Sequence, residues 1–133
     1  MQDRRQRGDQ GVATAILHYT RQGCIVSVPA TEATRYDLIV DRAGLLARVQ
    51  VKTTVYRRNG ACYIVQLRSA GGATYPSRKP VVFISDGECD LVFVLAGDGT
   101  AFEFPVSVVA GRSELTLNGD KQQYVVGQYL SIT

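Results

Sequence analysis

The chain has 133 residues, 45% of them hydrophobic, which predicts a single domain spanning residues 1–133 with one substantial core. No apolar run reaches the length of a membrane span and the N-terminus lacks the apolar region of a secretory signal, so we expect a soluble, cytoplasmic protein without a membrane partner. The cysteines are widely separated and form no C-x-x-C pair, which favours buried thiols in a reducing compartment over a disulfide framework or a zinc site.

The formal net charge is only +3, but its distribution along the chain is uneven. Residues 1–79 contain 13 Lys and Arg against 5 Asp and Glu, whereas residues 80–133 contain 2 against 7. A basic segment of this kind is typical of a protein that binds a polyanion, since each neutralised phosphate releases condensed counterions. A solvated surface with a chance imbalance is the alternative interpretation.

The first predicted elements are a polar arm and a helix. Residues 1–7 carry three arginines and predict a flexible arm, which is either a solvated tail or a contact with a polyanion backbone. Asp9 then suits a helix N-cap, and Gly23 ends the helix. His18, in mid-helix, is interpreted as a half-exposed structural side chain rather than a general base. The apolar stripe of this helix consists of Val12, Ala15, Ile16 and Tyr19.

The central predicted element is a hairpin. Residues 35–41 and 48–53 are apolar-rich runs with alternating polar residues, a pattern that predicts adjacent strands. Side chains two apart on a strand share a face, so Gln50 and Lys52 project to the same side. If Asp37 lies opposite them, a carboxylate, a carboxamide oxygen and an ammonium form one patch, which suits a divalent cation beside a phosphate. The alternative is the solvent-facing side of an ordinary antiparallel sheet.

The rest of the chain predicts further strands around a long loop at residues 68–80. This loop is either a functional loop or an ordinary connector between strands. A helix followed by consecutive strands indicates a mixed α/β sheet, in which strands joined by short turns are antiparallel neighbours. Asp90 is interpreted as a turn or capping carboxylate rather than a metal ligand. We expect strands at residues 24–28, 63–67, 81–84, 89–95, 100–104 and 114–117, a helical turn at 106–110, and a tail at 122–133 that packs on the sheet or on a second subunit.

Asp37 with Gln50-Val51-Lys52 resembles the PD-(D/E)xK nuclease signature in its Q-x-K variant. The bare pattern arises by chance in many proteins, but here it stands among further landmarks. From Gly8 to Thr53 the sequence is similar to the group I intron-associated branch of homing endonucleases. The resemblance implies a restriction-endonuclease-like α/β core, with an N-terminal helix packed on a mixed, largely antiparallel central sheet. The landmarks are Gly8, Gly23, Pro29, Arg35-Tyr36-Asp37-Leu38 and Val49-Gln50-Val51-Lys52-Thr53.

The resemblance also implies the roles of the hairpin residues. Asp37, Gln50 and Lys52 would be catalytic, and the metal ligands would be Asp37, the side-chain oxygen of Gln50 and the backbone carbonyl of Val51. The expected cofactor is Mg²⁺, one or two ions per site, with Mn²⁺ as a substitute. These nucleases often carry an acidic residue on the first helix, where this chain has Val12 in place of the common Glu. Asp9 is therefore either a further metal ligand or only a helix cap.

These assignments predict a metal-dependent endonuclease that hydrolyses phosphodiester bonds in double-stranded DNA. Cutting both strands requires two active sites, so a homodimer or higher homo-oligomer is expected. Two alternatives remain: a catalytically inactive DNA-binding module, and a junction-resolving, restriction or repair nuclease on the same fold. The expected contacts with the DNA backbone are Arg35, Arg48, Arg57, Arg58, Arg78 and Lys79.

Overall fold

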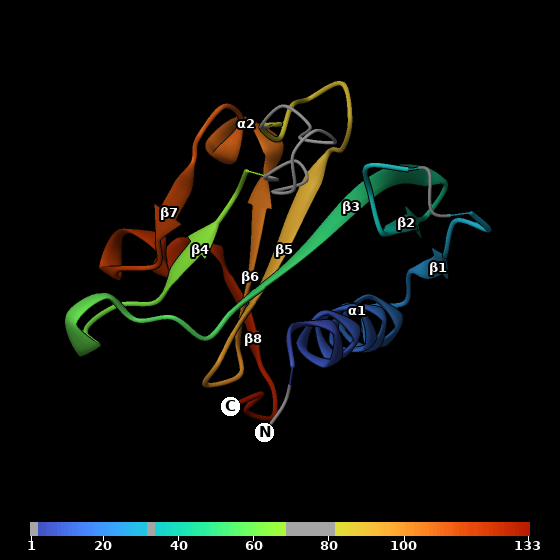
Figure 1. The fold of residues 1–133 in the computed structure, drawn as a ribbon. Coiled ribbons are helices and arrows are strands. Elements are labelled where there is room, and N and C mark those ends of the chain that lie inside the picture. The colour runs from blue at the N-terminus through green and yellow to red at the C-terminus, as the bar shows by residue number, and fades with distance from the viewer. Residues whose placement is uncertain (1–2, 32–33, 69–81) are drawn as a thin grey trace.

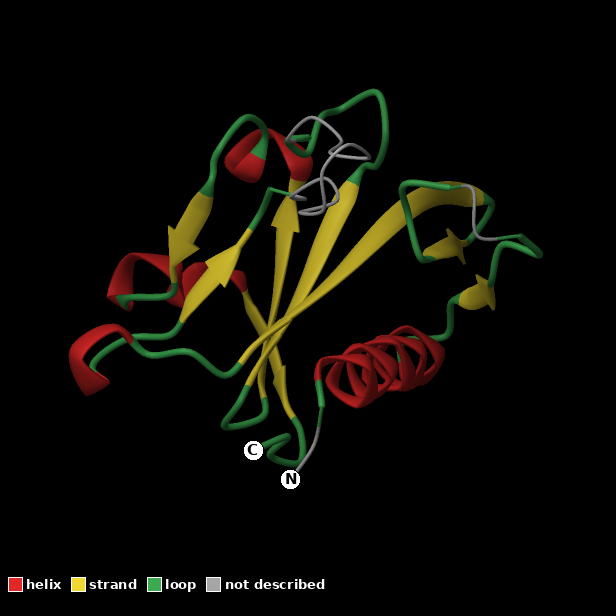
Figure 2. Cartoon of the chain, in the orientation of Figure 1, coloured by secondary structure: helices red, strands yellow, loops and turns green. Residues whose placement is uncertain are grey.

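The computed structural model describes residues 3–31, 34–68 and 82–133. Figures 1 and 2 show a long N-terminal helix beside a twisted sheet. The elements are α1 (Arg4–Arg21), β1 (Ile25–Ser27), β2 (Leu38–Arg42), β3 (Leu45–Thr54), η1 (Arg58–Gly60), β4 (Ile64–Gln66), β5 (Leu91–Ala96), β6 (Thr100–Pro105), α2 (Val106–Val109), β7 (Glu114–Thr116), η2 (Gly119–Tyr124) and β8 (Val125–Gln128).

The central sheet has six strands in the order β1-β2-β3-β5-β6-β8, and β4 pairs with β7 in a second, two-stranded sheet. Within the central sheet β3 and β5 are parallel, whereas the pairs on either side of them are antiparallel. The helix α1 lies on the side of the sheet away from β4 and β7 (Figure 1). The predicted α/β fold, with an N-terminal helix on a mixed, largely antiparallel sheet, is confirmed.

The helix α1 begins earlier than predicted. Asp3 is its N-cap and accepts the Gln6 amide at 2.8 Å, while the Gln6 side chain accepts the Asp3 amide at 3.2 Å. This reciprocal capping box satisfies two amides that would otherwise lack partners, so the chain is helical from Arg4 onwards. The predicted cap at Asp9 is therefore wrong, and residues 4–7 are not an arm. The predicted end is confirmed, since Gly23 adopts φ +85° just after the helix.

The strand β4 does not join its neighbour in sequence. We expected strands joined by a short turn to pair, but β3 and β4 form no ladder. Their ends are linked by an isolated bridge between Arg57 and Tyr63 and by hydrogen bonds of Ile64 with Tyr56 and Thr54. β4 instead pairs with β7, and β8 supplies the edge strand next to β6, so the tail packs on the sheet. The predicted loop at 68–80, except for Arg68, and Val81 of the predicted strand at 81–84 lie outside the described residues. Among residues 82–84, Val82 alone forms a bridge.

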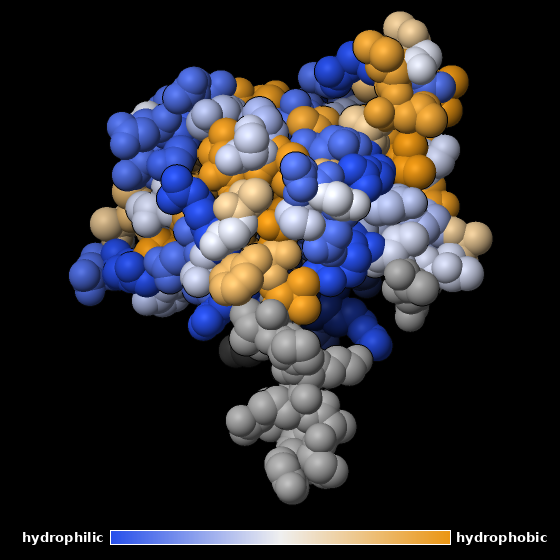
Figure 3. All heavy atoms as spheres, turned by 90° about the horizontal axis from the view of Figure 1, so that it is seen from above, coloured by the Kyte–Doolittle hydropathy of each residue, from blue (hydrophilic) through white to orange (hydrophobic). Residues whose placement is uncertain are grey.

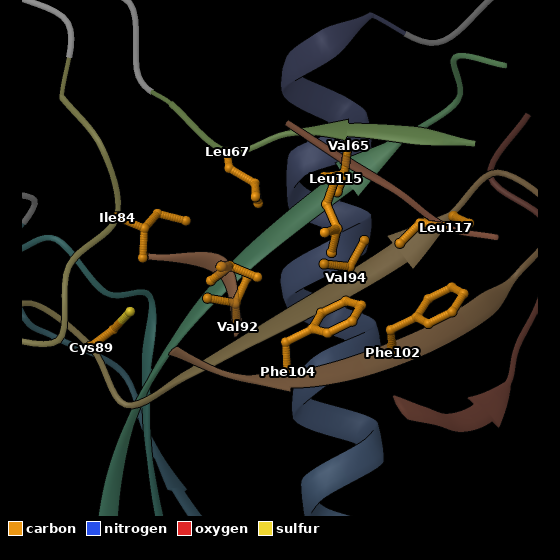
Figure 4. Packing of buried hydrophobic residues seen from close by; sticks show 12 residues of the cluster. Val65, Leu67, Ile84, Cys89, Val92, Val94, Phe102, Phe104, Leu115 and Leu117 are labelled. Atoms are coloured by element: carbon orange, nitrogen blue, oxygen red, sulfur yellow. The ribbon is translucent and has the colours of Figure 1, made fainter. Parts of the chain in front are cut away.

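Two hydrophobic clusters cover the two faces of the central sheet. One lies beneath β4 and β7, where Val92 and Val94 of β5 meet Phe102 and Phe104 of β6 and Leu115 of β7 (Figure 4). The other lies under α1, whose buried residues are Gly11, Ala15, His18 and Tyr19. His18 is only 3% exposed, so it is a core residue rather than the half-exposed one we predicted.

The helix approaches β3 most closely at Gly11. A Cβ atom built there would lie 2.5 Å from Thr53 Cγ2 and 3.2 Å from Val51 Cγ1. The absence of a side chain at this position therefore sets the distance between the helix and the strand that carries Gln50 and Lys52. No helix in the described part of the chain is long and apolar enough to span a membrane.

Candidate active site

The pairing of β2 with β3 fixes the position of Asp37. In the observed register Leu38 lies opposite Val49, and the Asp37 amide donates a hydrogen bond to the Val49 carbonyl at 2.8 Å. Asp37 therefore lies just before β2, beside the segment of β3 that runs from Val49 to Val51. The predicted patch of Asp37 with Gln50 and Lys52 thus draws on neighbouring residues of two adjacent strands, and its assignment stays a prediction.

The Asp37 carboxylate lies at an open edge of β3. β2 pairs with β3 only as far as Val49, and no other strand among the described residues pairs with this edge beyond that point. Val51 points its N–H and carbonyl to the same side as Val49, because alternate residues of a strand bond in the same direction. Asp37 Oδ2 accepts the Val51 N–H at 2.7 Å, so the Val51 carbonyl belongs to the edge where this carboxylate lies.

Lys52 lies on the same face of β3 as Gln50, and its side chain is half-buried. Burial lowers the pKa of its ammonium below the ordinary value; the carboxylate of Asp37 opposes this shift, and the guanidinium of Arg35 adds to it. The ammonium is thus close enough to Asp37 to interact with it electrostatically. A lysine with a lowered pKa exchanges a proton more readily near neutral pH than an exposed one does.

The oxygen atoms at this edge fit a hard divalent cation. They comprise the Asp37 carboxylate, whose Oδ1 accepts no hydrogen bond from the described residues, the Gln50 carboxamide and the Val51 carbonyl. Mg²⁺ prefers oxygen ligands of this kind and commonly keeps several waters. Asp37 supplies the one carboxylate among these three groups, and the described residues contain no cluster of three or more His, Cys, Asp or Glu side chains that could hold a metal ion.

Asp9 does not complete this site. It lies in the second turn of the helix with an exposed side chain. At roughly 100° per residue, Asp9 points about 160° away from Gly11, the residue that faces β3. Val12, the position at which the resemblance implied an acidic residue, is half-buried and apolar. The first helix therefore contributes no carboxylate, and the interpretation of Asp9 as a ligand has no support in the geometry.

The predicted DNA-contacting arginines already have partners within the chain. Arg35 pairs with Glu88 at 3.0 Å and Arg58 with Glu114 at 2.9 Å. Arg57 donates to the Tyr63 hydroxyl, and its guanidinium carbon lies 4.2 Å from the centroid of the Tyr63 ring. Arg48 is the most constrained, because its guanidinium binds Asp90 and the carbonyl oxygens of Asp86 and Gly87. Arg78 and Lys79 lie outside the described residues.

The sequence interpretation missed a cationic groove next to Lys52. This groove has a volume of about 550 Å³ and runs along the open edge of β3, between β4 and the N-terminus of α1. The signal was present in the spacing of Arg4, Arg7 and Gly11, which share one side of a helix. Placing the helix start at Asp9 hid that pattern. The charged residues of the groove are Arg4, Arg7, Lys52 and Arg68.

Comparisons with known proteins agree with this geometry. The sequence model of the PD-(D/E)XK endonuclease family matches residues 2–124. Among solved structures, that of the bacterial homing endonuclease I-Ssp6803I superimposes with a TM-score of 0.81, at 23% sequence identity, over 93% of this chain and 89% of that one. The comparison with curated proteins gave no match. The match to the family covers the hairpin, the open edge and α1.

Proposed function

The chain belongs to the PD-(D/E)XK endonuclease family, and we propose that it is a metal-dependent endonuclease hydrolysing phosphodiester bonds in double-stranded DNA. The observation that carries the proposal is the hydrogen bond of 2.7 Å from the Val51 amide to Asp37, which holds the carboxylate one residue from Lys52. A homing-type target is supported by the similarity of the fold to a bacterial homing endonuclease.

The chemistry follows from the residues at the open edge. Asp37, Gln50 and the Val51 carbonyl would hold Mg²⁺, which supplies Lewis-acid stabilisation of the charge that develops on the phosphate. Lys52 Nζ, when neutral, can accept a proton from the attacking water, and when charged it can hold a phosphate oxygen. Gln50 is a neutral ligand, so the site carries less negative charge than one with Glu. We therefore expect metal to bind more tightly once DNA phosphate is present.

A plasmid nicking assay tests the proposed site. Asp37→Asn and Lys52→Ala should each reduce Mg²⁺-dependent cleavage by about 100-fold or more, while gel-shift binding of DNA stays within about threefold of wild type. Asp9→Asn is the matched control and should cleave normally, because its side chain points away from β3. Full cleavage by the Asp37 and Lys52 variants would remove this assignment.

One observation favours a second candidate, a DNA-binding module without catalysis. Val12 leaves the site with a single carboxylate, so the metal site is weaker than in relatives with Glu at that place. A gel shift by the wild-type chain without cleavage in Mg²⁺ or Mn²⁺ would establish this module. Linear duplex, branched junction and single strand as parallel substrates distinguish a homing-type enzyme from junction-resolving or repair nucleases.

Cleavage of both strands leads us to propose a homodimer or higher homo-oligomer. Large apolar side chains are exposed near β1 and the β2–β3 turn, with Leu45 at 78% and Leu46 at 68%. Figure 3 shows hydrophobic side chains gathered at the right of the molecule, the end that carries these elements in Figure 1. Leu46→Asp should lower the mass measured by sedimentation equilibrium if a second copy covers this end, and an unchanged monomeric mass of the wild type would refute the oligomer.

A further inference from the structure

We propose that the groove beside Lys52 is a subsite for the DNA strand being cut, in which Arg4, Arg7 and Arg68 hold phosphates adjacent to the scissile one. This inference rests on the proposed nuclease function and extends it to residues that the hairpin signature does not include. It concerns where the substrate backbone lies, and not how the bond is broken.

The groove lies next to the proposed catalytic site. It begins at Lys52, which places one end at the proposed catalytic site, and continues past Thr54 to Tyr56 along β3. Its opposite wall is β4, which is anchored to β3 by the hydrogen bond of 2.6 Å from Thr54 Oγ1 to the Ile64 carbonyl. If the scissile phosphate of a DNA strand lies at Lys52, the adjacent nucleotides of that strand would therefore lie in this groove.

The helix α1 places two arginines over the groove. Arg4 and Arg7 precede Gly11 by seven and four residues, so all three lie within about 40° of one direction around α1. That direction faces the sheet, where Gly11, Ala15 and His18 are buried. The same side of α1 that packs on the sheet therefore carries Arg4 and Arg7 at its N-terminal end, where apolar residues would otherwise be expected. Because the helix extends there beyond the packed core, both arginines project over the groove.

The walls of the groove are positively charged. The described residues that line it include four cations, Arg4, Arg7, Lys52 and Arg68, and no acidic side chain. A concentration of positive charge without carboxylates suits phosphates, which arginine binds through its planar fork.

The size of the groove suits a short segment of one DNA strand. A volume of about 550 Å³ lies within the range of roughly 300–1,000 Å³ that is usual for ligand clefts, so the groove accommodates a segment of one strand. Tyr56, 55% exposed, stands at the far end and offers an aromatic surface for a sugar or base. Grooves that follow a single strand commonly combine cations on the backbone with aromatic rings in this way.

The test compares adjacent arginines of the same helix. Binding of a fluorescent 30-base-pair duplex of arbitrary sequence is measured by anisotropy in EDTA, where no cleavage occurs, over a series of salt concentrations. Arg4→Ala and Arg68→Ala should each weaken binding by about threefold to tenfold near 0.1 M salt and reduce the slope of log K against log salt by about 0.9, the value for one lost phosphate contact. Tyr56→Ala should weaken binding without changing the slope, because it removes no charge.

Arg5→Ala is the matched control, since Arg5 is exposed, lies roughly 120° from Gly11 around the helix and does not line the groove. It should leave both the affinity and the slope close to wild type. Equal effects of Arg4→Ala and Arg5→Ala, or no effect of Arg4→Ala and Arg68→Ala, would overturn the subsite. Melting temperatures show whether each variant folds, with Arg4→Gln as a second variant that retains helix propensity.

This outcome is separate from that of the proposed function. A wild-type chain that never cleaves DNA in Mg²⁺ would refute the nuclease, even if the slope changes as expected. A chain that cleaves, but whose Arg4 and Arg68 variants bind as wild type does, would refute the subsite alone.

Discussion

Lys52 occupies a position that lowers the stability of the folded protein. Its ammonium is half-buried between the hairpin and the groove, and burial is the main cause of its lowered pKa. A lowered lysine pKa means that the folded state disfavours the charged form, which the unfolded chain holds in water without penalty. The residue therefore costs stability at neutral pH, and this cost decreases as the pH rises through the folded pKa towards the unfolded one.

Replacing Lys52 by an apolar side chain of similar length should accordingly stabilise the metal-free protein. We expect Lys52→Met to raise the melting temperature at pH 7 by about 2 °C while cleavage is lost, and the gain should shrink at pH 10. Lys121→Met is the control, since Lys121 donates to Asn118 Oδ1 in a different part of the fold and should give no gain. A lower melting temperature for Lys52→Met would show that its attraction to Asp37 outweighs the burial.

The packing of α1 on β3 is the feature that gives the site its shape at the level of elements. Gly11 brings the helix against Val51 and Thr53, and the same contact aligns the arginine end of the helix with the groove. Interiors are close-packed, so one added methyl group at such a contact requires the helix or the strand to move.

Gly11→Ala and Gly8→Ala should therefore have opposite effects on stability. A Cβ at Gly11 would lie 2.5 Å from Thr53, so alanine there should destabilise by about 1–3 kcal/mol and reduce cleavage by displacing β3. A Cβ at Gly8 meets nothing within 4 Å, and alanine there should stabilise by about 0.5–1 kcal/mol through helix propensity. Chemical denaturation measures both, and a neutral Gly11→Ala would mean that the helix can shift freely.

The sequence allowed the local parts of this arrangement to be predicted, but not the distant ones. The pairing of β2 with β3, which brings Asp37 to the edge of β3, follows from strand alternation and a short turn, both of which are properties of neighbouring residues. The parallel pairing of Val49 with Leu91 joins strands separated by about 40 residues, and alternation says nothing about which distant strand is the partner. The start of α1 was misplaced because both Asp3 and Asp9 suit a cap, and the reciprocal bond to Gln6 decides between them.

At the scale of the whole molecule, the uneven charge along the chain is partly neutralised by folding. Each ion pair between described side chains joins an arginine from residues 1–79 to an acid from residues 80–133. The charge asymmetry that suggested a polyanion partner thus has a second use, which is to hold the two halves of the sequence together. Three arginines of residues 1–79, Arg35, Arg48 and Arg58, therefore have a structural use as well as a predicted use towards DNA.

Arg48 and Asp90 are the pair in which the structural use should dominate. Hydrogen bonds from the Arg48 side chain and backbone lower the pKa of the Asp90 carboxyl, and the two residues connect the parallel strands β3 and β5. A carboxyl whose folded pKa is depressed stabilises the fold above its unfolded pKa, near 4, and this stabilisation is lost as the pH falls through the folded value. Asp90→Asn should therefore cost about 1 kcal/mol at pH 7, and the difference from wild type should disappear near pH 2.

Arg58 should behave in the opposite way. Its pair with Glu114 is exposed, at 54% and 35% of the two side chains, and exposed pairs contribute little to stability. The acidic partner of Arg58 is one solvent-accessible carboxylate, so Arg58 can exchange Glu114 for a phosphate. Arg48 would have to lose its hydrogen bonds to Asp90, Asp86 and Gly87 at once. We expect Arg58→Ala to leave the unfolding free energy close to that of wild type while weakening DNA binding, and Arg48→Ala to lower the unfolding free energy more than it lowers DNA affinity. Chemical denaturation of both variants measures stability, and anisotropy measures DNA binding. Equal losses of stability would contradict the prediction, because they would mean that neither arginine is available to DNA.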